Sequence, residues 1–168
     1  MHSEDQRTEP NLSAIIEGLI QADIRFILVG GLATVVQGAP VTTLDVDIVH
    51  QQTDQNISKL FNFLCSVNAV YRRPDDKIIE PREKDLSGMG HALFSTRLGP
   101  LDVLAFIEQN QTYDDLIKFT IEIEFRGHSI HVLDIEKIIE LKETSNDPKD
   151  LQRLPLLRET LRQLQSRK

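Results

Sequence analysis

The segment Val29–His50, which reads VGGLATVVQGAPVTTLDVDIVH, constrains the fold of this chain more than any other. Two acids, Asp45 and Asp47, alternate with apolar residues in a stretch that otherwise predicts a buried strand. Because side chains alternate between the faces of a strand, we expect both carboxylates on one face. The opposite face is expected to enter the core with Leu44, Val46 and Ile48. Neighbouring carboxylates repel each other and are best tolerated around a cation, although the solvent face of an edge strand would also accept them.

Adjacent glycines, Gly30 and Gly31, precede these acids and follow the apolar run Arg25–Val29, which predicts a buried strand. Paired glycines allow a sharp turn and let a phosphate approach main-chain N–H groups. A short helix over 32–37 would add the dipole of its N-terminus to such an anion site. A plain strand-to-helix turn explains the glycines as well. A dinucleotide-binding turn would require Gly-x-Gly-x-x-Gly before a long helix, which GGLATV does not provide.

The remaining patterns predict helix, strand, helix, strand, helix, two hairpins and a helical C-terminal end. The further expected elements are a helix over 11–21, a strand over 42–50, a helix capped by Thr53 with Ile57, Leu60, Phe61 and Leu64 inside, a loop over 72–90, hairpins over 91–107 and 119–133, and helices over about 134–166 capped by Asp134 and Asp147. Pro155 predicts a kink or break in the last helix. This order favours an α/β fold with a mixed β-sheet and flanking helices. Residues 11–168 are expected to form a single domain after a loose tail over 1–10.

Composition bounds the functional class of the protein. The net charge of −7 argues against broad nucleic-acid binding. The polar N-terminal stretch MHSEDQRTEP, the lack of an apolar run of about 20 residues and the single Cys65 lead us to expect a cytoplasmic protein without a membrane span. The basic groups are expected on a solvated surface. They are Arg72, Arg73, Arg158, Arg162, Arg167 and Lys168.

Histidine and cysteine provide few candidates for chemistry. His128 and His131 are three residues apart on an expected strand, so they face opposite sides and cannot share a metal. His50 and His91 lie at ends of expected strands near the acids, where they could assist a proton transfer or, more simply, be surface or capping residues. Cys65 is expected to be a small buried apolar residue of a helix.

Asp102, in GPLDVLAFI, is a third acid isolated in an apolar strand. A turn-proximal acid would explain it. If its strand lies beside the strand of Asp45 and Asp47, the three carboxylates would form a two-metal site suited to in-line phosphoryl or nucleotidyl transfer. The candidate metal ligands are therefore Asp45, Asp47 and Asp102.

The order of these motifs resembles the nucleotidyltransferase superfamily, the polymerase-β-like fold. LVGGLATVVQGAP followed by TTLDVDIV resembles the opening of its minimal prokaryotic branch, which includes nucleotidyltransferase-like toxin–antitoxin proteins. LDIEKIIELKETSNDPKDLQRL resembles its C-terminal helices, and the resemblance extends over about 26–157. Three positions depart from the pattern: Gly31 stands where many members have Ser, Val41 where many have Arg, and Arg153 where many have a further Asp.

The resemblance implies Mg²⁺-dependent transfer of a nucleoside monophosphate from an NTP to an RNA, protein or small-molecule acceptor. Two Mg²⁺ ions would be held by the three aspartates, with Asp102 helping to activate the acceptor. The nucleotide would be bound by Gly30, Gly31, Thr43, Lys142 and Lys149, although a solvated helix face explains either lysine as well. The rival interpretation is a catalytically weak or inactive module of the same fold that binds a partner protein, as in a toxin–antitoxin pair.

Overall fold

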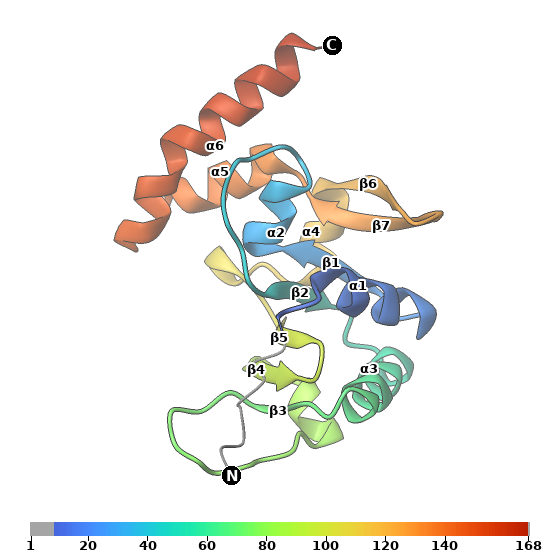
Figure 1. Ribbon diagram of the computed structural model, residues 1–168. Coiled ribbons are helices and arrows are strands. Elements are labelled where there is room, and N and C mark those ends of the chain that lie inside the picture. Colours follow the sequence, from blue (N-terminus) through green and yellow to red (C-terminus); the bar gives the residue numbers. More distant parts are fainter. Residues whose placement is uncertain (1–8, 168) are drawn as a thin grey trace.

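The computed structural model of the chain describes residues 9–167, in which seven strands form one mixed sheet (Figure 1). The strands are β1 (Phe26–Val29), β2 (Val46–His50), β3 (Val70–Tyr71), β4 (His91–Thr96), β5 (Gly99–Leu104), β6 (Thr120–Phe125) and β7 (His128–Leu133). The α-helices are α1 (Leu12–Gln21), α2 (Gly30–Val35), α3 (Asp54–Ser66), α4 (Tyr113–Leu116), α5 (Ile135–Glu143) and α6 (Pro148–Ser166). Short 3-10 turns cover Glu83–Leu86, Glu108–Asn110 and Ile117–Phe119. The predicted mixed-sheet α/β fold with a helical C-terminal end is confirmed.

Side chains cap the helices where the sequence predicted. The Thr53 hydroxyl accepts from the N–H of Asn56 at 3.2 Å and begins α3. Asp134 and Asp147 cap α5 and α6 by accepting main-chain N–H groups of their first turns. A capping oxygen satisfies one N–H group that has no partner within the helix, so these residues fix where each helix begins.

The strand order is β3-β4-β5-β2-β1-β7-β6, which makes β2 the middle strand of the sheet. β2 runs antiparallel to β1 and parallel to β5, and Asp47 lies opposite Val29 on one side and Asp102 on the other. Two segments that are more than fifty residues apart in sequence thus meet along one strand pair. β6 and β7 form the predicted second hairpin with a turn at Arg126 and Gly127.

The core consists of the apolar faces of the central strands and the helices that cover them. Ile27, Val46, Ile48, Leu60 and Leu101 are completely buried. α1 packs beside α3 and against β2 and β5, while α5 and α6 pack together at the other end of the sheet (Figure 1). Burial on this scale is the main favourable term in folding and holds β2 and β5 rigidly in register.

The strand that carries the acids is shorter than predicted. β2 begins at Val46, and Leu44 is 66% exposed rather than part of the core. The reason is that its antiparallel partner β1 ends at Val29, opposite Asp47, where the chain turns into α2. No β1 residue remains to pair with Leu44, so the chain before Val46 is an unpaired connection.

Two helical details also differ from the prediction. α6 continues without the predicted break through Pro155, and the nearby Leu154 and Leu157 of the same helix are buried. Their burial holds the helix together across the missing N–H group of proline. Cys65, expected to be buried, is exposed, because α3 turns Leu60, Phe63 and Leu64 toward the core instead.

The N-terminal tail predicted over 1–10 lies almost wholly outside the described residues. Of the helices within residues 9–167, none has both the length and the apolar character that a membrane crossing requires.

Candidate active site

Three carboxylates converge at the centre of the sheet. Asp45, Asp47 and Asp102 each offer one oxygen, and these oxygens all lie within 4.8 Å of one another. Asp47 and Asp102 are opposite each other on the parallel strands β2 and β5, so their side chains emerge on the same face. Asp45 joins them from the connection that precedes β2. The structure therefore brings together the three acids that the sequence singled out.

Gly30 makes room for one of these carboxylates. Its φ of +71° lies in the left-handed region, and a Cβ at this position would be 2.0 Å from Oδ2 of Asp47. No side chain larger than hydrogen fits there without displacing Asp47. The first glycine is thus required by the close approach of the acid, which is a more specific role than a general turn.

Burial and mutual repulsion raise the proton affinity of the cluster. Burial raises the pKa of Asp47 to about 8, and hydrogen bonding to Asp102 and the charge of Asp45 act in the same direction. Burial and the charge of Asp102 also raise the pKa of Asp45. The raised pKa values mean that the three carboxylates are unfavourable when all are ionised without a cation. Mg²⁺ or another divalent cation binds such hard oxygen ligands and stabilises their ionised form. The residues present fit such a metal.

Arg72 supplies a positive charge to the cluster. Its Nη2 donates to Oδ1 of Asp102 at 2.9 Å and to the main-chain oxygen of Phe94 at 2.8 Å. The guanidinium opposes the pKa rises of Asp45 and Asp47. Arg72 is exposed, as expected of a solvated surface, but its pairing with Asp102 was not predicted. A lone Arg-Arg pair at the start of a loop gives no signal of its partner, because Asp102 is thirty residues further along the chain.

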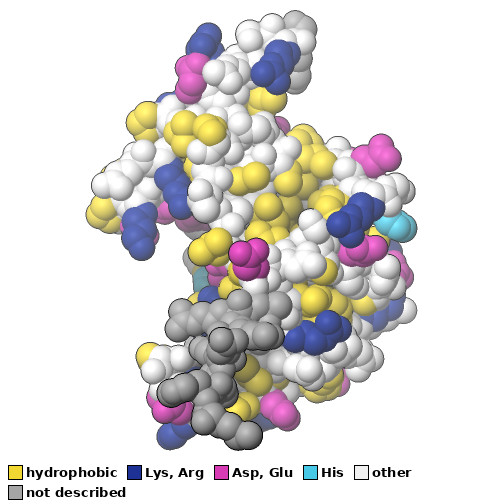
Figure 2. Space-filling model, viewed as in Figure 1, with side chains coloured by type: hydrophobic (Ala, Val, Ile, Leu, Met, Phe, Trp, Pro, Cys, Tyr) yellow, Lys and Arg dark blue, Asp and Glu magenta, His cyan; other side chains and the backbone are white. Residues whose placement is uncertain are grey.

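Two pockets meet at Asp47. One, of about 430 Å³, is lined mainly by apolar side chains of β5, β7 and α5, together with Gly30, His91, Glu108 and Lys142. The other, of about 420 Å³, is lined by Gly31, Thr42, Thr43, Leu44, Asp45, Arg72, Pro100 and Arg153. In Figure 2 the outline of the molecule is indented between the part that carries α6 and the part that carries β3 and β4. Asp47 thus lies between a pocket lined mainly by apolar residues and one lined mainly by polar residues.

Thr43 orients the first acid of the motif. Its hydroxyl lies 3.3 Å from the main-chain oxygen and 3.4 Å from Oδ1 of Asp45, to which it can donate. It also lies beside Gly31, where a Cβ would be 3.2 Å from the Thr43 hydroxyl oxygen. Thr43 is therefore a positioning residue as well as a lining residue of the polar pocket.

The two candidate lysines occupy different places. Lys142 lines the apolar pocket and donates from Nζ to Oδ1 of Asp150 at 2.8 Å. Burial alone would raise the pKa of Asp150, but hydrogen bonds from Lys142 and Ser145 outweigh it and the pKa is lowered. Lys149 is exposed in the first turn of α6 and lines neither of the two pockets. Of the pair, only Lys142 is positioned at the site.

Of the four histidines considered, only His91 lines one of the two pockets. His91 lines the apolar pocket, with its ring 4.8 Å from that of Phe106. His50 was expected to be a surface or capping residue but is 2% exposed, with Nε2 2.8 Å from the main-chain oxygen of Leu86. It lies at the other end of β2 from the acids. His128 and His131 belong to none of the possible metal-binding groups among the described residues.

Comparison with solved structures relates this geometry to known proteins. No protein-family model and no curated protein matches the sequence. The structure is similar to that of a proposed nucleotidyltransferase from Thermotoga maritima, with a TM-score of 0.50 and 18% identity, over 92% of this chain and 90% of that one. It is also similar to the antibiotic-resistance factor ANT(2″)-Ia, with a TM-score of 0.53 and 14% identity, over 89% of this chain and 83% of that one.

The fold is that of the nucleotidyltransferases. At this level of identity the likeness concerns the fold and leaves the chemistry to be argued from the site. On this fold, Asp45, Asp47 and Asp102 converge beside two adjoining pockets. The lining of these pockets also includes Glu108, Lys142, Arg72 and Arg153.

Proposed function

We propose that this protein is a nucleotidyltransferase that moves a nucleoside monophosphate from an NTP to an acceptor hydroxyl or phosphate. The observation that carries the proposal is the convergence of Asp45, Asp47 and Asp102 beside Gly30 on a nucleotidyltransferase fold. In this reaction an acceptor oxygen bonds to the α-phosphorus, the bond to the β-phosphate oxygen breaks, and pyrophosphate leaves. Charge is redistributed over phosphate oxygens, so such a site acts mainly by positioning and by electrostatics.

The three aspartates would hold divalent cations, which we propose to be two Mg²⁺ ions. Bound there, the cations would supply Lewis acidity toward the phosphate oxygens and the acceptor. Asp102 is proposed to accept the proton of the attacking hydroxyl, while Arg72 holds its carboxylate in place through Oδ1. Thr43 keeps Asp45 turned toward the same point.

The pockets on either side of Asp47 would accommodate the two substrates. The polar pocket, with Gly31, Thr43 and two arginines, suits a chain of phosphates. The largely apolar pocket, with Lys142 and His91 at its wall, suits an organic group that carries few charges. We propose that Lys142 contacts substrate from α5. Lys149 lies in the exposed first turn of α6 and lines neither pocket, so we propose that it contributes less to nucleotide binding than Lys142 does.

The test is a transfer assay with α-labelled ATP, CTP, GTP and UTP, Mg²⁺ and cell extract, with labelled products separated into RNA, protein and small molecules. The wild type is expected to label one class of acceptor. Asp45→Asn and Asp47→Asn are expected to lower the initial rate by about a hundredfold or more. Asp76→Asn is the matched control, because Asp76 is exposed in the 72–90 loop.

Two results would count against this proposal. Full transfer by Asp47→Asn would remove the carboxylates from the mechanism. Tight NTP binding by the wild type without transfer to any acceptor, together with a partner protein that co-purifies, would favour a non-catalytic member of a toxin–antitoxin pair.

A further inference from the structure

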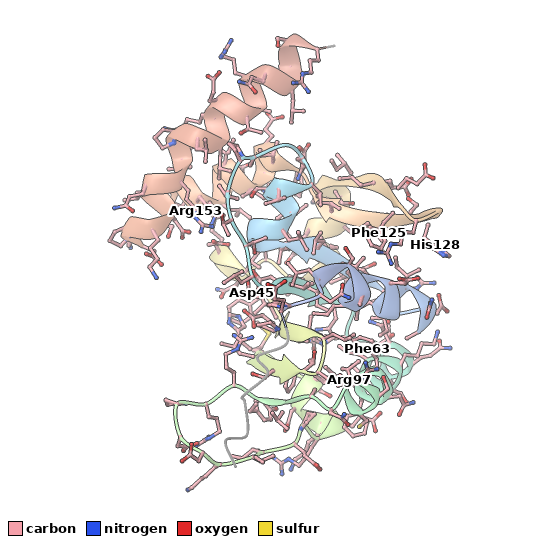
Figure 3. All side chains as sticks on the ribbon, in the orientation of Figure 1. Asp45, Phe63, Arg97, Phe125, His128 and Arg153 are labelled. Carbon is pink, nitrogen blue, oxygen red and sulfur yellow. The ribbon has the colours of Figure 1, made fainter. Side chains whose placement is uncertain are left out.

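Arg153 is a guanidinium at the site without a protein partner among the described residues. It extends from α6 toward the part of the chain that carries Asp45 (Figure 3). Within residues 9–167, no salt bridge or side-chain hydrogen bond engages it, whereas its neighbours on α6, Arg158 and Arg162, pair with glutamates. Its Nη1 lies 3.8 Å from the point that a Cβ on Gly31 would occupy. The guanidinium therefore stands against the glycine turn that enters α2.

The charged groups around Arg153 indicate which class of ligand it could bind. The pocket that it lines also contains Asp45 and Asp47, so a simple anion would meet two carboxylates. Arg72, the other arginine of the pocket, is already engaged with Asp102 and Phe94. A polyphosphate that carries a divalent cation matches both features, because its metal faces the carboxylates while its outer oxygens face the guanidinium of Arg153.

We propose that Arg153 binds the phosphate chain of the nucleotide, acting from α6 across Gly31. This inference rests on the proposed nucleotidyl transfer and assigns a substrate-binding residue to it. The resemblance implied an aspartate at this position, where this chain has an arginine. A guanidinium donates two parallel hydrogen bonds to phosphate oxygens, which suits the end of a phosphate chain.

Binding measurements test this inference separately from catalysis. Isothermal titration calorimetry would determine dissociation constants for inorganic triphosphate and for ATP, CTP, GTP and UTP in the presence of Mg²⁺. Arg153→Ala is expected to weaken the binding of triphosphate and of the preferred NTP by about ten- to a hundredfold, as loss of a charge-assisted contact does. Arg153→Lys should recover part of the loss. Arg158→Ala is the matched control, because Arg158 is an exposed arginine of the same helix paired with Glu143.

Each outcome decides between the inference and the function on which it rests. Thermal unfolding of Arg153→Ala should match the wild type, because the side chain is exposed and unpaired among the described residues. If the wild type binds triphosphate and NTP and Arg153→Ala binds them equally well, the inference is overturned while the proposed function stands. If Arg153→Ala tightens Mg²⁺ binding and leaves triphosphate affinity unchanged, Arg153 only balances the carboxylates and the inference is again overturned. If the wild type binds neither ligand, the proposed function fails with it.

Discussion

Asp47 and Asp102 occupy directly opposed positions on the parallel strands β2 and β5. Opposed residues of neighbouring strands project from the same face at short range, so the pairing register alone brings the two carboxylates together. A shift of one residue in either strand would send one acid to the opposite face. The apolar residues that alternate with these acids, Val46, Ile48, Leu101 and Val103, are buried and prevent such a shift.

The close approach of Gly30 to Asp47 predicts the effect of one added methyl group. Gly30→Ala should lower the free energy of unfolding by about 1–3 kcal/mol through its left-handed backbone, and should also displace the Asp47 carboxylate. Gly127→Ala is the matched control, because Gly127 has a φ of +83° and a Cβ added there would meet nothing within 4 Å. Calorimetric Mg²⁺ titration should show weaker binding for Gly30→Ala alone. Equal affinities in the two variants would contradict the proposed steric role.

The raised pKa of Asp47 predicts how stability depends on pH. Because this pKa is 3.8 as the reference value and about 8 in the folded protein, the folded state binds more protons across that window. The free energy of unfolding of the metal-free protein should therefore fall, relative to Asp47→Asn, as the pH rises through the window. Denaturant unfolding with a chelator at several pH values measures this difference. Added Mg²⁺ should restore stability mainly at the alkaline end, and a difference that does not vary with pH would refute the assignment.

Arg72 predicts a dependence of stability on divalent cations. Without this guanidinium, the three carboxylates have lost the positive charge that is paired with Asp102. Arg72→Ala should therefore show a larger rise in melting temperature on addition of Mg²⁺ than the wild type does. Arg73→Ala provides the control, since Arg73 is adjacent but pairs with Asp75 in the loop. Equal rises in all three proteins would show that Arg72 does not neutralise the cluster.

The different places of the two lysines predict unequal effects on transfer. Lys142→Ala should lower the rate of transfer by about tenfold or more, because Lys142 lines the pocket that also contains Asp47. Lys149→Ala should have a much smaller effect, because that side chain is exposed outside both pockets. Asp150→Asn removes the ion-pair partner of Lys142 but leaves its ammonium. This variant therefore separates the effect of the Lys142–Asp150 pair on protein stability from the effect of the ammonium on substrate binding. A larger loss for Lys149→Ala would reverse this assignment.

Local patterns predicted most of the secondary structure, because they depend on neighbours in sequence. The caps at Thr53, Asp134 and Asp147 and the alternation of β6 and β7 are read within a few residues. The predictions were wrong where the structure of a residue depends on a segment that is distant in sequence. Leu44 is exposed because β1 ends too early to pair with it.

By itself, the sequence determined that Asp45 and Asp47 alternate with apolar residues and that Asp102 is isolated in a second apolar segment. It also indicated that a pair of glycines comes before them. Only the tertiary structure decided that β2 and β5 are neighbours in a register that aligns Asp47 with Asp102, and that Arg72 and Arg153 line the same polar pocket. The physical reason is range. Strand alternation and capping act over a few residues, whereas strand pairing and ion pairs join segments whose separation along the chain carries no local signal.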